Sequence, residues 1–206
     1  MGCPTDGKHG KFRPQLKPTR RGKKRKNRKS KKSEYFSVFG TNANGLKAKK
    51  RSLENTLKHF DFPCVVLVQE TMLKQKGKLK LDGYQVFEPE KENKGQGLLT
   101  AIRQDLDAAV VFDSEDEAEI LVVQTQVGDM SIRVCNAYGP QESTLTDATK
   151  LNFWQQLEKQ IIAAFDANCE IVVELDANAK VGPGVIAGDP NPQSDNGKLL
   201  IDLFAK

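Results

Sequence analysis

The sequence has few of the side chains that most often bind zinc or form disulfides. It holds two histidines and four cysteines in 206 residues, and no two cysteines have the spacing of a metal-binding pair. A zinc site is therefore not predicted. Three of the cysteines, Cys64, Cys135 and Cys169, lie in apolar runs, where a free cysteine behaves as a small hydrophobic residue.

Other absences exclude whole classes of protein. No apolar run is long enough to cross a membrane, and the first residues do not form a signal peptide. No glycine-rich loop of the P-loop type is present, which argues against a P-loop nucleotide site. We therefore expect a protein of a reducing, intracellular compartment.

Positive charge is concentrated at one end of the chain. Residues 1–32 contain 14 of the 32 Lys and Arg residues and one of the 27 acidic residues, which leaves 18 basic and 26 acidic residues in 33–206. The segment RRGKKRKNRKSKK (20–32) has no apolar face and cannot bury enough surface to fold alone. We predict a disordered basic arm at 1–33 and one domain at 34–206.

Dense runs of Lys and Arg bind nucleic acid phosphates or direct nuclear import, while a tail that only aids solubility is the plainer alternative. We expect the arm to bind nucleic acid and the protein to be located in the nucleus. The residues predicted to contact nucleic acid are Arg20, Arg21, Lys23, Lys24, Arg25, Lys26, Arg28 and Lys29.

The rest of the chain alternates apolar runs of strand length with segments of helical period. The patterns predict helices over 49–60, 147–165 and 198–204, and strands over 34–40, 63–70, 83–89, 97–103, 108–112, 117–127, 130–140 and 169–176. The resulting order is strand, helix, strand, then a meander of strands, then helix and strand. This order predicts an α/β fold with mixed sheets.

Polar residues follow four of these apolar runs. Each could be a turn or cap residue taken alone, but four such endings could also project from one edge of the sheets. A carboxylate such as Glu70 suits Mg²⁺, which binds few carboxylates and keeps water and phosphate as its other ligands. Asp176 could accept a proton from an attacking water, and neutral amides could donate to phosphate. The set therefore favours metal-assisted phosphodiester hydrolysis.

Four short motifs strengthen this interpretation. NANGL, VQET, NAYGP and LDANA occur in the order and rough separation found in the endonuclease/exonuclease/phosphatase superfamily, which residues 35–206 resemble. The segment NAKVGPG…SDNGKLLIDLF is most similar to the endonuclease domains of non-LTR retrotransposons, which accompany a reverse transcriptase. The resemblance implies a four-layer α/β sandwich with two mixed sheets face to face. It also implies a hydrolase that cuts DNA with Mg²⁺, or with Mn²⁺ in its place.

The resemblance also implies roles for matching residues. Glu70 would be the principal metal ligand, with Asn44 beside it. The catalytic residues would be Asn42 and Tyr138 at the metal and phosphate, Asp176 aligning the nucleophilic water, and Asn178 binding the reacting phosphate. Gln141 would touch the nucleic acid backbone.

The sequence departs from the superfamily at its C-terminal end. Relatives continue into further strands with an Asp-His pair, whereas this sequence ends at Lys206, and its only histidines are His9 and His59. We therefore expect a domain that is C-terminally incomplete, with impaired activity. The alternatives are a non-catalytic, nucleic-acid-binding remnant of such a domain and a phosphomonoesterase.

Overall fold

Two four-stranded mixed sheets form the centre of the fold. The computed structural model describes residues 35–73, 79–90, 96–114, 119–141, 146–187 and 190–205, all within the compact unit Glu34–Lys206. The predicted basic arm and its nucleic-acid-binding residues lie outside the described residues.

The first sheet has the strand order β1-β2-β4-β3, and β1 and β2 are its one parallel pair. Its strands are β1 (Val38–Asn42), β2 (Val65–Gln69), β3 (Tyr84–Phe87) and β4 (Leu99–Arg103). The second sheet has the order β5-β6-β7-β8, and its parallel pair is β7 and β8. Its strands are β5 (Ala108–Asp113), β6 (Glu119–Val127), β7 (Met130–Tyr138) and β8 (Glu170–Asp176).

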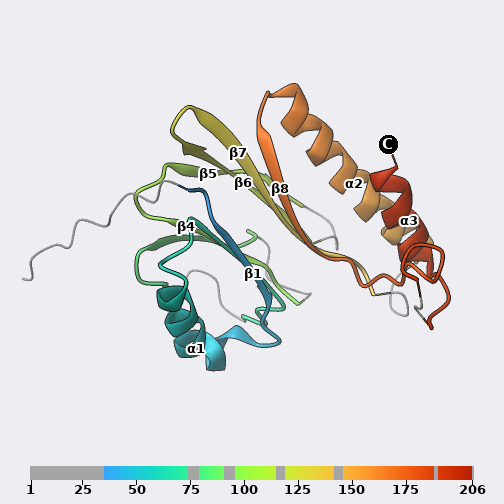
Figure 1. Cartoon of the computed structure of the whole chain (residues 1–206), viewed down its shortest axis with the longest axis horizontal. Coiled ribbons are helices and arrows are strands. Elements are labelled where there is room, and N and C mark those ends of the chain that lie inside the picture. The colour runs from blue at the N-terminus through green and yellow to red at the C-terminus, as the bar shows by residue number, and fades with distance from the viewer. Residues whose placement is uncertain are drawn as a thin grey trace, which may run out of the picture. The chain divides into compact units, whose positions relative to one another are not determined.

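The helices cover the outer faces of the two sheets (Figure 1). Helix α1 (Leu46–His59) packs on the first sheet, and α2 (Asp147–Asp166) and α3 (Asp195–Phe204) pack on the second. Between the sheets lies a third apolar layer, in which Val65 and Leu67 of β2 meet Leu121 and Val134. The four-layer α/β sandwich predicted from the sequence is confirmed. None of the helices in the described part of the chain combines the length and apolar character that a membrane crossing requires.

Most sequence patterns correspond directly to this layering. Every residue of β2 is buried because the sheet is covered on both faces, as its continuous apolar run predicted. Helix α2 does not bury all of its apolar residues, since Leu151 and Phe165 are exposed whereas Phe153 and Trp154 are buried. Helix α3 begins at Asp195, three residues earlier than predicted, because the Ser194 hydroxyl caps it by accepting the Gly197 N–H.

Two amides cross the apolar layer between the sheets. Gln69 Nε2 at the end of β2 donates to Asn136 Oδ1 on β7 at 3.0 Å, and both side chains are buried. Asn136 Nδ2 in turn donates to the carbonyl oxygens of Leu99, at 3.0 Å, and Val68, at 3.3 Å. Because buried amides need partners, these bonds fix the spacing of the sheets beneath their carboxyl ends. Gln69 and Asn136 are polar residues at the ends of apolar runs, and their hydrogen bonds show that they hold the two sheets together.

The thiol of Cys135 should be inert in the folded protein. Burial raises its pKa to about 12, so that about one thiol in ten thousand is ionised at pH 8. Cys64 and Cys169 are also buried, as their apolar surroundings predicted. We expect a thiol reagent at pH 8 to leave all three unmodified until urea unfolds the chain. Peptide mass mapping of the label would test this, and rapid labelling of Cys135 without denaturant would contradict it.

Candidate active site

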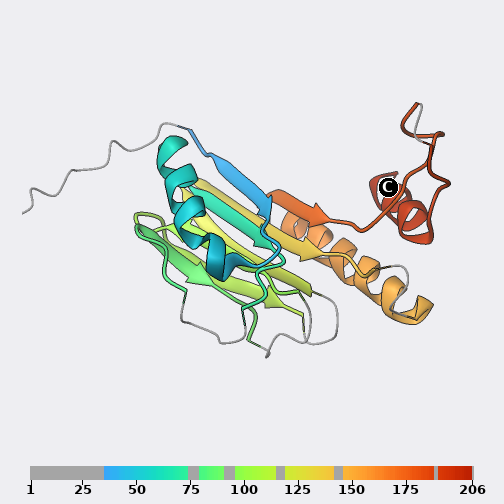
Figure 2. The ribbon, with the colours of Figure 1, turned by 90° about the horizontal axis from the view of Figure 1, so that it is seen from below.

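The carboxyl ends of β1 and β8 lie side by side, although they belong to different sheets (Figure 2). Asn42, the last residue of β1, donates from Nδ2 to Asp176 Oδ2 at 2.8 Å. Asp176 is the last residue of β8, and its other oxygen, Oδ1, accepts the backbone N–H of Asn178 at 3.4 Å. Each carboxylate oxygen therefore has one donor and keeps acceptor capacity for a further group. Two predicted catalytic residues, 134 positions apart in the chain, are in direct contact.

Asn178 is held in place by the end of β7. It has a left-handed backbone, with φ 45°, and its Nδ2 donates to the Gly139 carbonyl at 2.7 Å. The Gly139 N–H donates back to the Asp176 carbonyl at 2.7 Å. A Cβ atom at position 139 would lie 2.7 Å from the Ala177 carbonyl oxygen, so only glycine allows β7 and β8 to end this close together.

A second group of predicted residues gathers at the end of β2. Tyr138 Oη donates to Glu70 Oε1 at 3.1 Å, and Gln141 Nε2 donates to Tyr138 Oη at 3.3 Å. Burial raises the pKa of the Tyr138 hydroxyl, and hydrogen bonds with Asn178 and Gln141 partly oppose this rise. Tyr138 is directly opposite Asp176 in the β7–β8 ladder, so it joins the Glu70 group to the Asp176 group. The structure thus brings the predicted catalytic residues together with Glu70 and Gln141.

Asn44 is the residue predicted to bind the metal ion beside Glu70. It lies in the turn after β1, where its backbone N–H donates to Asn42 Oδ1 at 3.1 Å. Its side chain is exposed and is not among those lining the cleft described below. Lys49 Nζ from α1 donates to the carbonyls of Ala43, at 2.5 Å, and Asn44, at 3.0 Å. This ammonium group adds a positive charge at the end of β1 that sequence reasoning missed.

A shallow cleft of about 410 Å³ opens over the Asn42–Asp176 contact. The side chains that line it include Asn42, Gln69, Glu174, Asp176 and Asn178. Glu174 and Asp176 are two residues apart on β8 and therefore project to the same face. The Glu174 carboxylate occupies the space above Gly40 of β1, where any Cβ would collide with it. The cleft thus holds a second carboxylate, to which the sequence analysis gave no role.

Another missed residue is Asn196, at the start of α3. It is fully buried and donates from Nδ2 to the carbonyls of Pro140, at 2.6 Å, and Asn178, at 3.3 Å. Its Oδ1 accepts the indole N–H of Trp154 at 3.1 Å. Trp154, predicted to be a core residue, therefore also anchors the amide that holds the Asn178 segment. A polar residue within a Ser-Asp-Asn-Gly cap gives no sequence signal of such burial.

The donor set suits a magnesium ion better than zinc. Among the described residues, no three His, Cys, Asp or Glu side chains lie close enough to hold a metal ion together. Mg²⁺ usually binds through one or two carboxylates and keeps waters and substrate phosphate as its other ligands. Glu70 is partly exposed, and Tyr138 orients one of its oxygens. The residues present therefore fit a cation that is bound largely by water and phosphate.

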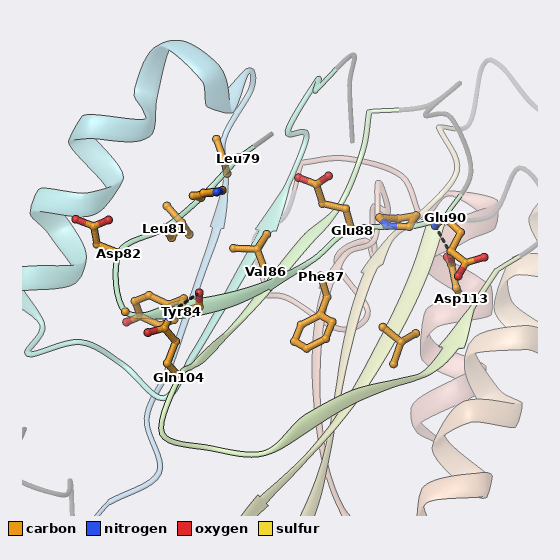
Figure 3. Close-up of a pocket in the computed structure, with 14 residues that line it drawn as sticks. Leu79, Leu81, Asp82, Tyr84, Val86, Phe87, Glu88, Glu90, Gln104 and Asp113 are labelled. Carbon is orange, nitrogen blue, oxygen red and sulfur yellow. Dashed lines mark hydrogen bonds between the residues drawn. The ribbon is translucent and has the colours of Figure 1, made fainter. Parts of the chain in front are cut away.

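A larger hollow, of about 1070 Å³, lies elsewhere along the free edges of β3 and β5 (Figure 3). Its lining combines apolar side chains such as Val86 and Phe87 with acidic ones such as Glu88 and Asp113. Asp113 Oδ2 accepts the Glu90 backbone N–H at 2.5 Å at one end of the hollow. None of the predicted site residues that the structure describes lines it.

No family model matches this sequence, and no curated protein matches it either. Solved structures do match its fold. The endonuclease domain of TRAS1, a telomere-specific non-LTR retrotransposon, is 17% identical with a TM-score of 0.58, over 83% of this chain and 70% of that one. An AP endonuclease from Archaeoglobus fulgidus is 18% identical with a TM-score of 0.59, over the same two shares.

A third match is the 3′ phosphatase NExo from Neisseria, bound to a product DNA hairpin. It is 15% identical with a TM-score of 0.57, and the alignment covers 83% of this chain and 71% of that one. Identities this low establish the fold rather than the chemistry. All three proteins have the same architecture. The chain therefore has the fold of the endonuclease/exonuclease/phosphatase superfamily.

Proposed function

We propose that this protein hydrolyses phosphodiester bonds in DNA as a Mg²⁺-dependent endonuclease. The observation that carries the proposal is the direct contact of Asn42 with Asp176 beside the linked pair Glu70 and Tyr138. The site brings together the Asp176 carboxylate, which can accept further hydrogen bonds, and the Glu70 carboxylate, which suits a cation. Several neutral donors lie beside them. Structural neighbours of this fold are nucleases and phosphatases acting on DNA, which supports the same chemistry.

Each side chain then has a distinct task. Asp176 accepts a hydrogen bond from the attacking water and orients its lone pair towards phosphorus. Asn42 holds Asp176 in position through its 2.8 Å bond. The Asn178 amide, held beside Tyr138 by its bond to Gly139, is the group that would bind a non-bridging phosphate oxygen. Tyr138, whose hydroxyl pKa is raised by burial, stays protonated at neutral pH and donates to Glu70.

Glu70 would hold the metal ion, with Mn²⁺ as a substitute for Mg²⁺. When bound, the ion neutralises charge that develops on the phosphate and the leaving oxygen. The bond from Tyr138 Oη fixes one oxygen of Glu70 and leaves the other for the ion. Asn44 is a second candidate ligand, with an exposed and neutral amide.

DNA is the proposed substrate because the same chain carries a basic arm in addition to this site. The arm supplies 14 Lys and Arg residues that can replace counterions along a polyanion, which a small phosphate ester does not require. The same run of charge is the basis for proposing a nuclear location. We further propose a retrotransposon-type endonuclease, because a domain of this kind is among the structural neighbours.

Nicking of supercoiled plasmid tests the proposal. We expect conversion of supercoiled to open-circular DNA with Mg²⁺ or Mn²⁺ and none with EDTA. Phosphate release from a 3′-phosphorylated oligonucleotide, measured in parallel, separates an endonuclease from a phosphomonoesterase. Phosphate release without nicking would assign the site to phosphomonoesters, and inactivity on both substrates at millimolar metal would overturn the proposal.

A second candidate function is nucleic acid binding without catalysis. It is favoured by the finding that no three potential metal-binding side chains cluster among the described residues. In that case the domain would act as a scaffold for the arm. Tight DNA binding that is unaffected by metal ions, together with an absence of cleavage, would select this alternative.

DNA binding should depend steeply on salt, and the arm should supply most of that dependence. The logarithm of the association constant should fall linearly with the logarithm of salt concentration, by about 0.9 for each phosphate contacted. Deleting residues 1–32 should flatten this slope by several such contacts and weaken binding at 100 mM salt. Fluorescence anisotropy with a labelled duplex would measure both effects. An unchanged slope would show that the arm does not contact phosphate.

A further inference from the structure

A half-buried carboxylate that the proposed mechanism does not use lies near Glu70. Glu119, the first residue of β6, accepts the backbone N–H of Gln96 at its Oε1 at 2.7 Å. Its Oε2 accepts the backbone N–H of Gly97 at 2.8 Å. Both oxygens are therefore bound to the short segment that leads into β4.

That segment holds the backbone that follows Glu70. The Gly97 carbonyl accepts the Thr71 N–H at 3.0 Å, and the Gln96 carbonyl accepts the Met72 N–H at 2.8 Å. Glu70 and Met72 both have left-handed backbones, with φ of 50° and 49°. Residues other than glycine keep this conformation only where their surroundings impose it. The hydrogen bonds from Thr71 and Met72 are among the contacts that do so.

Glu119 also lies next to the partner of Glu70 on the other side. In the β6–β7 ladder it is directly opposite Tyr138, so the two side chains project to the same face of the sheet. Tyr138 holds the Glu70 carboxylate directly, at 3.1 Å. Two neighbouring side chains of the second sheet thus fix Glu70 of the first, one through its carboxylate and one through its backbone.

We propose that Glu119 is a positioning residue for Glu70. Its carboxylate clamps the segment at Gln96 and Gly97, and this segment holds Glu70 in the left-handed conformation that brings its carboxylate to Tyr138. The inference rests on the proposed function, because it takes Glu70 to be the metal ligand. Glu119 would then be needed for metal affinity without touching the metal or the substrate.

Glutamine cannot replace Glu119 in this arrangement. A carboxylate accepts at both oxygens, whereas a carboxamide has one acceptor and would turn its NH₂ group towards a backbone N–H. One of the two bonds would be lost and a donor would face a donor. Burial and the nearby Glu70 carboxylate raise the pKa of Glu119, while the N–H bonds from Gly97 and Gln96 lower it, so these bonds favour the ionised form. Glu119→Asp keeps the charge on a shorter stem and should retain part of the clamp.

The test uses the full chain and two readouts that do not require turnover. Titration calorimetry with Mn²⁺ measures metal affinity, and amide hydrogen exchange measures opening at Thr71 and Met72. We expect Glu119→Gln to weaken Mn²⁺ binding about tenfold, as loss of an outer-shell partner typically does. Exchange at the Thr71 and Met72 amides should accelerate. Glu119→Asp should fall between the parent and Glu119→Gln.

A matched control separates positioning from general stability. Asp113 also accepts a backbone N–H, that of Glu90, in the hollow beside β3 and β5. Asp113→Asn should leave Mn²⁺ affinity and exchange at Thr71 unchanged.

If Glu119→Gln accelerates exchange but binds Mn²⁺ as tightly as the parent, Glu119 is merely structural and the proposal is wrong. A parent chain that binds no Mn²⁺ overturns the proposed function itself, which distinguishes the two failures. If Glu119→Gln does not fold, unchanged Mn²⁺ affinity in Glu119→Asp overturns the proposal.

Discussion

Plasmid nicking should fall about a thousandfold when Glu70 is replaced by glutamine. The change keeps the size of the side chain and an acceptor for the Tyr138 hydroxyl, so the fold should be preserved. It removes the carboxylate charge on which the cation depends. A bound metal ion contributes several kcal/mol of charge stabilisation in the transition state, and about 4 kcal/mol corresponds to a thousandfold change in rate. Initial nicking rates at several Mg²⁺ concentrations would measure the loss.

The control for Glu70 is another glutamate of the same domain. Glu54 on α1 forms an i,i+4 ion pair with Lys50 at 3.3 Å and takes no part in the site. Glu54→Gln should cleave at the parent rate. Raising Mg²⁺ should partly restore Glu70→Gln if the residue binds the ion. If Glu70→Gln nicks DNA at a rate within a factor of about ten of the parent, Glu70 is not the metal ligand that the proposal requires.

Replacing Asp176 with asparagine should lower the cleavage rate by about a hundredfold to ten-thousandfold, the range typical of a lost general base. The Asn178 N–H can still donate to the new amide oxygen, so the turn after β8 should survive. What disappears is the second acceptor, which receives the Asn42 amide and orients the attacking water. Unlike Glu70→Gln, this variant should bind Mn²⁺ about as tightly as the parent, which calorimetry can establish.

Asp176 could instead be only a turn residue, and the same variant decides between the two explanations. Under that explanation Asp176→Asn would be fully active, since asparagine is an equally good turn former. Asp166→Asn, at the exposed end of α2, provides the matched control.

The sequence predicted the elements and the strand ends well because both depend on local patterns. The apolar run before Asp176 gave a strand that ends at the expected residue, and the run before Glu70 gave one that ends one residue earlier, at Gln69. The expectation that polar residues at four strand ends share one edge agrees with the contact between Asn42 and Asp176. Periodicity was less reliable for α2, where Phe165 falls beyond the surface that the sheet covers and stays exposed.

The features that the sequence could not reveal are contacts between distant segments. Asn196 and Trp154 are 42 residues apart, and their hydrogen bond exists only because α3 returns to α2. Glu119 is bonded to the backbone of Gln96, 23 positions earlier. A carboxylate or amide at the start of an element looks in sequence like an ordinary cap. Only the packing of the two sheets shows that such residues hold the neighbours of Asn178 and Glu70 in place.

The pairing of Gly40 with Glu174 has a consequence for how homologous sequences would be interpreted. The two residues share one volume, contributed by strands of different sheets. Because a carboxylate at the end of a flexible side chain can move, a methyl group at position 40 would redirect Glu174 within the cleft rather than disrupt the fold. Substitutions at position 40 should therefore covary with the length and charge of residue 174. A glycine-to-alanine change at position 40 would then look neutral in an alignment, although it moves a negative charge within the cleft.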